Sequence, residues 1–267
     1  MIPAVGLSLL SFLSFLAGRS SLPGNVVDVV ARDFFLKAPD TIPAGLTTLR
    51  LKVEQGAHMA ILERLDSGYT AADLLRARRD GHPRPPWMHF VGGPGFPGPN
   101  GIANATMVLT PGHYVILCDV EDRDGVRHFE KGMFRPLVVR AVPAERGPAA
   151  QTPGSLPRAD ATVAMRDYSF TFSAPLRAGM RVLRVQNRGT VMHEFRVVHV
   201  LPGHTGKESL AWKPEDKTPR PDEDVAALVG IMPGGEIETT IAFEAGEYVV
   251  LCVPEIAHGM MQVVRVR

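Results

Sequence analysis

Apolar and polar residues alternate along several short stretches of the chain. In TTLRLKV, at 47–53, the apolar Leu49, Leu51 and Val53 alternate with basic residues, and aromatic residues occupy every second position of DYSFTF at 167–172. A period of two with one apolar face predicts half-buried β-strands. Because turn residues separate several such stretches in each half of the chain, the pattern predicts an all-β fold built as a sandwich or a barrel.

One helix is predicted to interrupt the strand pattern in each half. In the first half, Thr70 and Asp73 of TAADLLRARR have the spacing of a capping box, with Leu74 and Leu75 available for burial. The glycine-rich FVGGPGFPGPNG at 90–101 is not followed by Gly-Lys-Ser/Thr, so it is predicted to be a turn and not a phosphate-binding loop.

The chain contains two copies of one pattern. ARDFFLKAPDTIPAG at 31–45 corresponds to MRDYSFTFSAPLRAG at 165–179. TPGHYVILC, which ends at Cys118, corresponds to EAGEYVVLC, which ends at Cys252, and each is followed by a Gly-Met pair that opens a last apolar stretch. Matched segments in the same order predict two tandem copies of one domain.

The distances between landmarks support the same division. His58 precedes Cys118 by 60 positions, and His193 precedes Cys252 by 59. The segment between the copies is rich in Pro, Ala and Gly, as linkers are. We therefore expect these segments: an apolar N-terminal segment at 1–22, a first domain at 25–141, a linker at 142–160 and a second domain at 161–267.

The N-terminus contains an apolar run at 4–17 that is too short to span a bilayer. Such a run is typical of a signal peptide, which predicts export to the periplasm or the extracellular space and no membrane span in the mature chain. No Lys or Arg precedes the run and no Ala-x-Ala site follows it, so a buried N-terminal helix is the alternative.

Composition excludes some partners. The 267 residues carry a net charge of +1, which gives no basic surface for nucleic acid or an anionic membrane. A content of 45% hydrophobic and 21% charged residues is ordinary for a globular protein. The only cysteines, Cys118 and Cys252, occupy equivalent places in the repeat, which argues against a disulfide between them.

Each copy also contains, in the same order, residue types that suit a soft metal ion. A histidine begins a strand after a glycine turn, a cysteine ends a later strand, and a Gly-Met pair opens the last strand. A soft copper site takes a thiolate, two imidazoles and a weak thioether. The sequence therefore predicts a copper centre assembled from distant strands.

These motifs resemble those of the cupredoxins, the family of plastocyanin and pseudoazurin. NRGTVMHEF, at 187–195, is similar to the family's Asn-x-Gly-x-x-x-His motif, and GHYVILC and GEYVVLC are similar to the strand before its ligand loop. The resemblance covers both copies. It implies two tandem cupredoxin-like Greek-key β-sandwiches.

In the first copy, the resemblance implies one type 1 copper ion bound by four ligands: His58, Cys118, His128 and Met133. His128 and Met133 are separated by four residues, as in the family. The turn before His58 is shorter than the family's, and Glu54 stands roughly where the asparagine is expected.

In the second copy, the resemblance implies an altered site. CVPEIAHGM has the length of the family's loop Cys-x-Pro-His-x-x-x-Gly-Met, but Glu255 falls on the histidine. The remaining candidates for a second copper ion are His193, Cys252, His258 and Met260. Either Glu255 binds metal itself, or it faces solvent and leaves Cys252 a buried thiol. We favour the second outcome, because a carboxylate beside a thiolate accumulates negative charge.

The function implied by the resemblance is that of an exported one-electron carrier with copper in the first domain and an unidentified redox protein as its partner. Two-domain cupredoxin enzymes bind further copper through His-x-His pairs or a histidine beside the ligand cysteine. The sequence has neither, so it predicts that the chain is not an enzyme. The alternative is a copper-free or copper-sequestering binding or scaffold protein.

Overall fold

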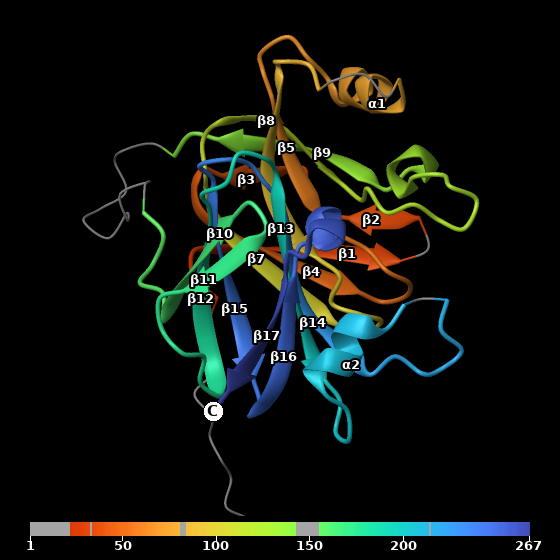
Figure 1. Cartoon of the computed structure of the whole chain (residues 1–267). Helices are drawn as coiled ribbons and strands as arrows, with labels where there is room; N and C mark the ends of the chain where they lie inside the picture. Colours follow the sequence, from red (N-terminus) through yellow and green to blue (C-terminus); the bar gives the residue numbers. More distant parts are fainter. Residues whose placement is uncertain (1–21, 33, 81–83, 143–154, 214) are drawn as a thin grey trace, which may run out of the picture.

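The computed structural model of the protein describes residues 22–32, 34–80, 84–142, 155–213 and 215–267, and its regular structure is mostly β-strand, as predicted (Figure 1). The first repeat comprises β1 (Asn25–Arg32), β2 (Phe35–Lys37), β3 (Thr41–Pro43), β4 (Gly45–Val53), β5 (Ile61–Leu65), α1 (Ala71–Arg79), β6 (Met88–Gly95), β7 (Ile102–Leu109), β8 (Gly112–Leu117), η1 (His128–Lys131) and β9 (Phe134–Arg140). The second comprises β10 (Ala161–Arg166), β11 (Ser169–Phe172), β12 (Gly179–Asn187), β13 (His193–Val200), α2 (Gly206–Ala211), β14 (Asp222–Ile231), β15 (Glu236–Phe243), β16 (Gly246–Leu251), η2 (Val253–His258) and β17 (Met261–Val266).

Two sheets run through both repeats. Their strand orders are β11-β10-β12-β15-β7-β4-β1-β2 and β17-β16-β13-β14-β6-β5-β8-β9-β3. The repeats join where β15 pairs with β7 and where β14 pairs with β6, both antiparallel. Because equivalent strands meet and the order on one side of each junction mirrors the other, an approximate two-fold relation connects the two halves. The sequence did not indicate this edge-to-edge joining.

The glycine-rich segment predicted as a turn is strand in its first half, because β6 includes 90–95 and lies at the junction. Its second half, 96–101, leaves the strand and contains a turn closed by a hydrogen bond from the Gly101 N–H to the Gly98 carbonyl at 3.1 Å. Its glycines allow backbones to approach closely. A Cβ on Gly93 would lie 2.0 Å from the carbonyl oxygen of Ala60, and one on Gly92 would lie 2.5 Å from Ile237 of the second repeat. At these two positions glycine serves strand packing and not a turn.

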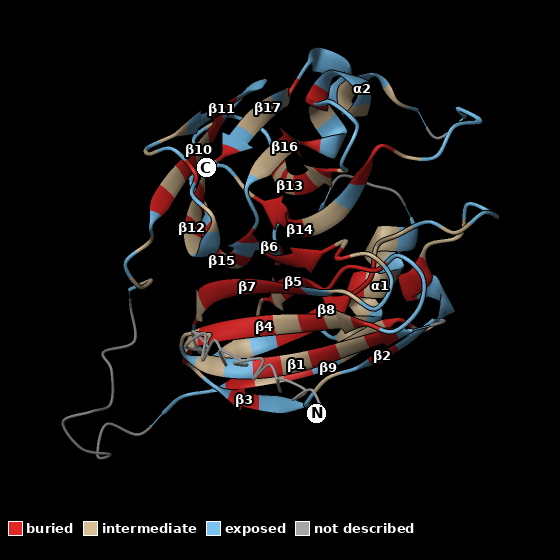
Figure 2. Cartoon of the chain, turned by 90° about the horizontal axis from the view of Figure 1, so that it is seen from below, coloured by how far each residue is buried: buried red, intermediate tan, exposed pale blue. Residues whose placement is uncertain are grey.

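The core lies between the two sheets, where buried residues, red in Figure 2, gather along β4, β7, β5 and β6. Leu49, Leu51 and Val53 of β4 are all buried, as their alternation predicts. In the second repeat Phe170 is buried, but Tyr168 is 53% exposed. Tyr168 has φ 69° and lies in the turn before β11, so the alternating pattern began inside a turn.

Both helices begin with capping boxes. The Thr70 side chain accepts from the Asp73 N–H, and Asp73 accepts from the Thr70 N–H, as predicted, while Leu74 is buried. Thr205 and Glu208 make the same reciprocal pair at the start of α2. Within the described part of the chain, no helix is long and apolar enough to cross a membrane. The predicted signal segment lies outside the described residues, as does 143–154 of the predicted linker.

Candidate metal centre

Three predicted ligands of the first repeat meet in the interior. His58 lies just before β5, Cys118 directly follows β8, and His128 begins η1. Cys118 Sγ lies 3.7 Å from His58 Nδ1 and 3.5 Å from His128 Nδ1, and the two Nδ1 atoms are 3.2 Å apart. Among the described residues, this is the only group of at least three His, Cys, Asp or Glu side chains with all ligand atoms within 4.8 Å of one another.

The spacing of these atoms fits a single ion. Nitrogen and sulfur ligands lie about 2.0 and 2.3 Å from a bound first-row ion such as zinc, so a trigonal set would place two nitrogens about 3.5 Å apart and sulfur about 3.7 Å from each. The observed separations of 3.7, 3.5 and 3.2 Å are close to these values. One ion at the centre of the triangle could therefore contact all three atoms.

Burial acts in opposite directions on the thiol and on the imidazole of the cluster. Burial raises the pKa of the Cys118 thiol to about 11, while N–H groups of Met59 and Val120 that point at the sulfur favour the thiolate. Burial lowers the pKa of His128, which favours a neutral imidazole with a free lone pair. A bound ion would replace the thiol proton and compensate the thiolate charge.

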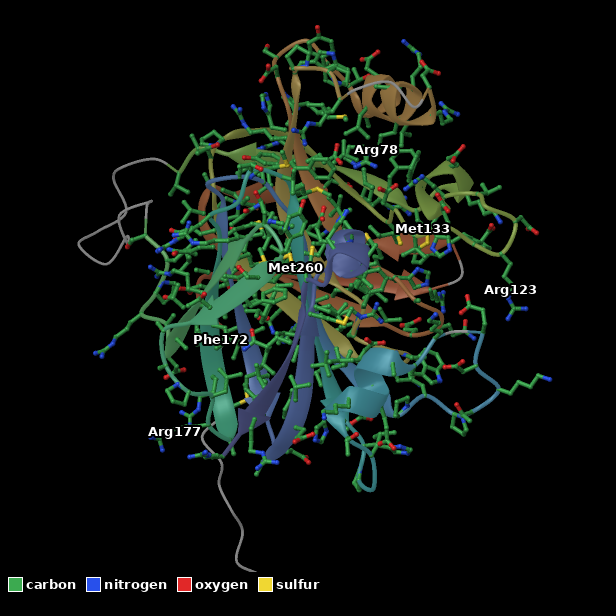
Figure 3. All side chains as sticks on the ribbon, in the orientation of Figure 1. Arg78, Arg123, Met133, Phe172, Arg177 and Met260 are labelled. Atoms are coloured by element: carbon green, nitrogen blue, oxygen red, sulfur yellow. The ribbon has the colours of Figure 1, made fainter. Side chains whose placement is uncertain are left out.

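Met133, labelled in Figure 3, is fully buried and is fixed to the other ligands through its main chain. Its carbonyl accepts from the Cys118 N–H at 3.0 Å, and its N–H donates to the His128 carbonyl at 3.1 Å. The left-handed Gly132 ends η1 and allows this turn. The loop therefore links the main chains of three predicted ligands.

One aromatic side chain covers the outer side of His128. The Phe34 ring packs edge-on against the imidazole with centroids 5.1 Å apart, and Lys131 Nζ lies 4.4 Å from the Phe34 centroid. Phe34 is 40% exposed, so this ring contact links the largely buried His128 to the protein surface.

Arg78, labelled in Figure 3, connects α1 to the segment 118–133, here called the ligand loop because it carries Cys118, His128 and Met133. Its guanidinium pairs with Glu63 of β5 and, at 2.9 Å, with Asp119, the residue after Cys118. It also lies 5.7 Å from the ring centroid of Phe129, the residue after His128. Asp119 is held on its other side by Arg127 at 3.0 Å. Sequence reasoning missed this network, and the polar RARR stretch gave no sign that one arginine is buried.

The second repeat keeps half of the arrangement. His193 Nδ1 lies 3.7 Å from Cys252 Sγ, and the Glu194 N–H donates to this sulfur at 3.3 Å, as the Met59 N–H does to Cys118 in the first repeat. Burial raises the pKa of the Cys252 thiol to about 11. Both cysteines are buried and free, as the repeat predicts.

Glu255 takes the place of His128 in the main chain but not in the cluster. The Met260 N–H donates to the Glu255 carbonyl at 3.1 Å, which matches the Met133–His128 bond. The carboxylate instead accepts a hydrogen bond from His258 at 2.8 Å, and its side chain is 16% exposed. It therefore neither joins Cys252 and His193 in a described three-donor group nor turns fully to solvent.

No protein-family model and no curated protein matches the chain. Among solved structures, it is similar to auracyanin from Roseiflexus castenholzii, with 20% identity, a TM-score of 0.28, and coverage of 40% of this chain and 94% of that one. A multicopper oxidase matches with 14% identity, a TM-score of 0.24, and coverage of 91% and 88%. The copper-containing nitrite reductase from Thermus scotoductus SA-01 matches with 12% identity, a TM-score of 0.25, and coverage of 91% and 61%.

This comparison contradicts the prediction that the chain is not an enzyme, because the structures that match over 91% of it are those of enzymes. The prediction was wrong in its reasoning as well, since missing His-x-His pairs exclude only the copper sites that use them. At these identities and TM-scores the similarity assigns no reaction to this chain. The His58–Cys118–His128 cluster of this chain can hold a metal ion.

Proposed function

We propose that the first repeat binds one type 1 copper ion through His58, Cys118, His128 and Met133, and that this centre passes single electrons to and from a redox protein partner. The observation that carries the proposal is the buried cluster of one sulfur and two imidazole nitrogens at separations of 3.2–3.7 Å.

The donor set favours copper over other first-row ions. Thiolate and thioether sulfur are soft ligands that suit Cu(I), and imidazole suits both oxidation states. When bound, copper would supply a one-electron couple. The chain supplies rigid positions for its ligands, because the His58 carbonyl accepts from the Phe96 N–H of the neighbouring segment at 3.0 Å and the Cys118 and Met133 main chains are bonded to each other.

The surroundings of the cluster suit electron transfer. All three donor residues are buried, which excludes water and limits the rearrangement of polar groups when the charge of an ion changes. Phe34 packs against His128, is 40% exposed, and offers a partner protein an apolar contact beside this ligand. The proposal includes export of the protein, on the strength of the apolar run at 4–17.

Copper titration of the purified full chain tests the proposal. One equivalent of Cu(II) should produce an intense visible band, since the thiolate gives a charge-transfer transition. Cys118→Ser should abolish the band. Cys252→Ser is the matched control, since it alters an equally buried cysteine in the other repeat, and it should keep the band.

A protein that binds no copper and shows no colour would instead support the copper-free scaffold. Tight copper binding without the band would support sequestration. A band that survives in Cys118→Ser and disappears in Cys252→Ser would place the coloured centre in the second repeat and contradict the proposal.

A further inference from the structure

We infer that the second repeat is a separate binding site for Cu(I), held by His193, Cys252 and Met260, and that it does not form a type 1 Cu(II) site. This inference goes beyond the proposed function, which concerns the first repeat alone. It gives the two repeats different functions. Copper in the first repeat would alternate between Cu(I) and Cu(II), and copper in the second would stay as Cu(I).

The first support is the preserved His–Cys pair. The distance of 3.7 Å between Cys252 Sγ and His193 Nδ1 equals that between Cys118 Sγ and His58 Nδ1. Both residues of the second pair are fully buried. The N–H of Glu194 points at the sulfur at 3.3 Å and stabilises its thiolate form.

The second support is a carboxylate that orients the imidazole. His193 Nε2 lies 3.1 Å from Asp167 Oδ1, and Asp167 is fixed by the Thr190 N–H and hydroxyl at 2.9 and 2.8 Å. A carboxylate at one ring nitrogen holds the proton there and leaves the other nitrogen free to bind metal. Nδ1, which faces Cys252, is therefore a prepared donor.

The local backbone is built around this contact. A Cβ on Gly189 would lie 2.2 Å from Asp167 Oδ1 and 2.6 Å from His193 Nε2. Only glycine fits between the carboxylate and the imidazole. Core packing alone would not require a buried imidazole that pairs with a carboxylate. It would also not require a glycine beside that pair.

The third donor is the Met260 thioether. Met260 is fully buried, and its carbonyl accepts from the Cys252 N–H at 3.1 Å, as Met133 does from Cys118 in the first repeat. The left-handed Gly259 ends η2 as Gly132 ends η1. The loop therefore carries Met260 in the same relation to its cysteine that Met133 has.

The missing donor decides the oxidation state. Glu255 stands where the second imidazole would be, but its carboxylate is engaged by His258 at 2.8 Å. One imidazole, one thiolate and one thioether form a soft set that selects Cu(I). Cu(I) with a thiolate is also neutral, whereas Cu(II) would leave a net positive charge in a buried site, which is costly.

Stoichiometry with each oxidation state tests the inference on the full chain. Under anaerobic conditions, Cu(I) competed against bicinchoninate should bind at two equivalents, while Cu(II) should give one equivalent of the coloured species. Cys252→Ser should lower the Cu(I) stoichiometry to one and keep the colour, which also shows that the variant folds. Cys118→Ser should lose the colour and keep one Cu(I).

A second variant addresses the orienting carboxylate. Asp167→Asn should weaken Cu(I) binding at the second site by about 10–100-fold, the usual effect of removing such a partner. Asp160→Asn, which alters a hydrogen bond to the main chain of Val182, is the control and should not change it. A Cu(I) stoichiometry that is the same in Cys252→Ser as in the wild type would overturn the inference. If the first site binds no copper while Cys252→Ser still removes one Cu(I), the proposed function fails and this inference stands.

Discussion

Replacing Arg78 with methionine should destabilise the folded protein, because Arg78 makes ion pairs with Glu63 and Asp119 and contacts the Phe129 ring. Arg78 is 10% exposed in its side chain, and its partner Glu63 is 0% exposed. The substitution keeps an apolar stem of about the same length as that of arginine and removes the guanidinium. Asp119 retains Arg127 at 3.0 Å, so Glu63 is the one carboxylate of this network left buried without an ion-pair partner, and only the more distant charge of Arg84 still acts on it.

The size of the effect follows from that single uncompensated charge. Breaking a buried ion pair by removing one partner costs about 3–5 kcal/mol. The loss of the guanidinium contact with the Phe129 ring adds about 0.5–1 kcal/mol. We expect a loss of about 3.5–4.5 kcal/mol in the free energy of unfolding, near the low end of the summed range because the helix can shift to admit water.

Urea unfolding of the copper-free protein measures this loss. The control is Arg76→Met on the same helix, because Arg76 is 68% exposed and pairs with Asp73 only at 3.5 Å. Such surface pairs contribute about 0–1 kcal/mol. In the copper-loaded protein, Arg78→Met should also shift the visible band, since Asp119 and Phe129 adjoin two ligands, whereas the control should not.

The pH dependence gives an independent check. Burial raises the pKa of Glu63, and the Arg78 charge opposes that rise. Without Arg78 the folded pKa rises further above the unfolded one, so the folded state binds more protons and gains stability as the pH falls. The deficit of Arg78→Met should therefore be larger at pH 7 than at pH 5, and adding Glu63→Gln should recover more than half of it. A deficit no larger than that of Arg76→Met, or one that grows at low pH, would refute this role.

Three further predictions concern other parts of the molecule. Glu255→His should create a second coloured Cu(II) site, visible as absorbance that survives in a Cys118→Ser background, and no new band would mean that the loop does not deliver position 255 to Cys252. Gly189→Ala should lower the melting temperature by an amount equivalent to about 1–3 kcal/mol, because its Cβ would meet Asp167 and His193, and an unchanged melting temperature would contradict the tight contact. The hydrogen bond from Arg50 lowers the pKa of Asp28 from 3.8 to about 2. The ion pair therefore stabilises the folded state above about pH 4, and this stabilisation is lost as the pH falls towards 2. Asp28→Asn should weaken the dependence of the free energy of unfolding on pH over that range, and an unchanged dependence would contradict the prediction.

The sequence predicted those features that depend on local pattern. Alternation at Leu49, Leu51 and Val53 identified a buried strand, and the Thr70–Asp73 spacing identified the start of a helix. The order of His58, Cys118 and His128 along the first repeat identified the cluster, because the resemblance supplied which strand ends meet.

What escaped the sequence depends on contacts between distant segments. The joining of the repeats through β6 and β14 uses main-chain hydrogen bonds at glycines, which leave no side-chain pattern to read. The buried pair of Arg78 and Glu63 looks like ordinary surface charge in the sequence. The hydrogen bond between Glu255 and His258 depends on side-chain directions in η2, and so neither predicted outcome for Glu255 described it.

X-ray absorption at the copper edge tests the central claim most directly. In the full chain loaded with one equivalent of Cu(II), it should show one sulfur at about 2.3 Å and two nitrogens at about 2.0 Å, similar to the distances of other first-row ions. The sulfur shell should vanish in Cys118→Ser and remain in Cys252→Ser. Copper surrounded only by nitrogen and oxygen in the wild type would contradict a centre built on Cys118.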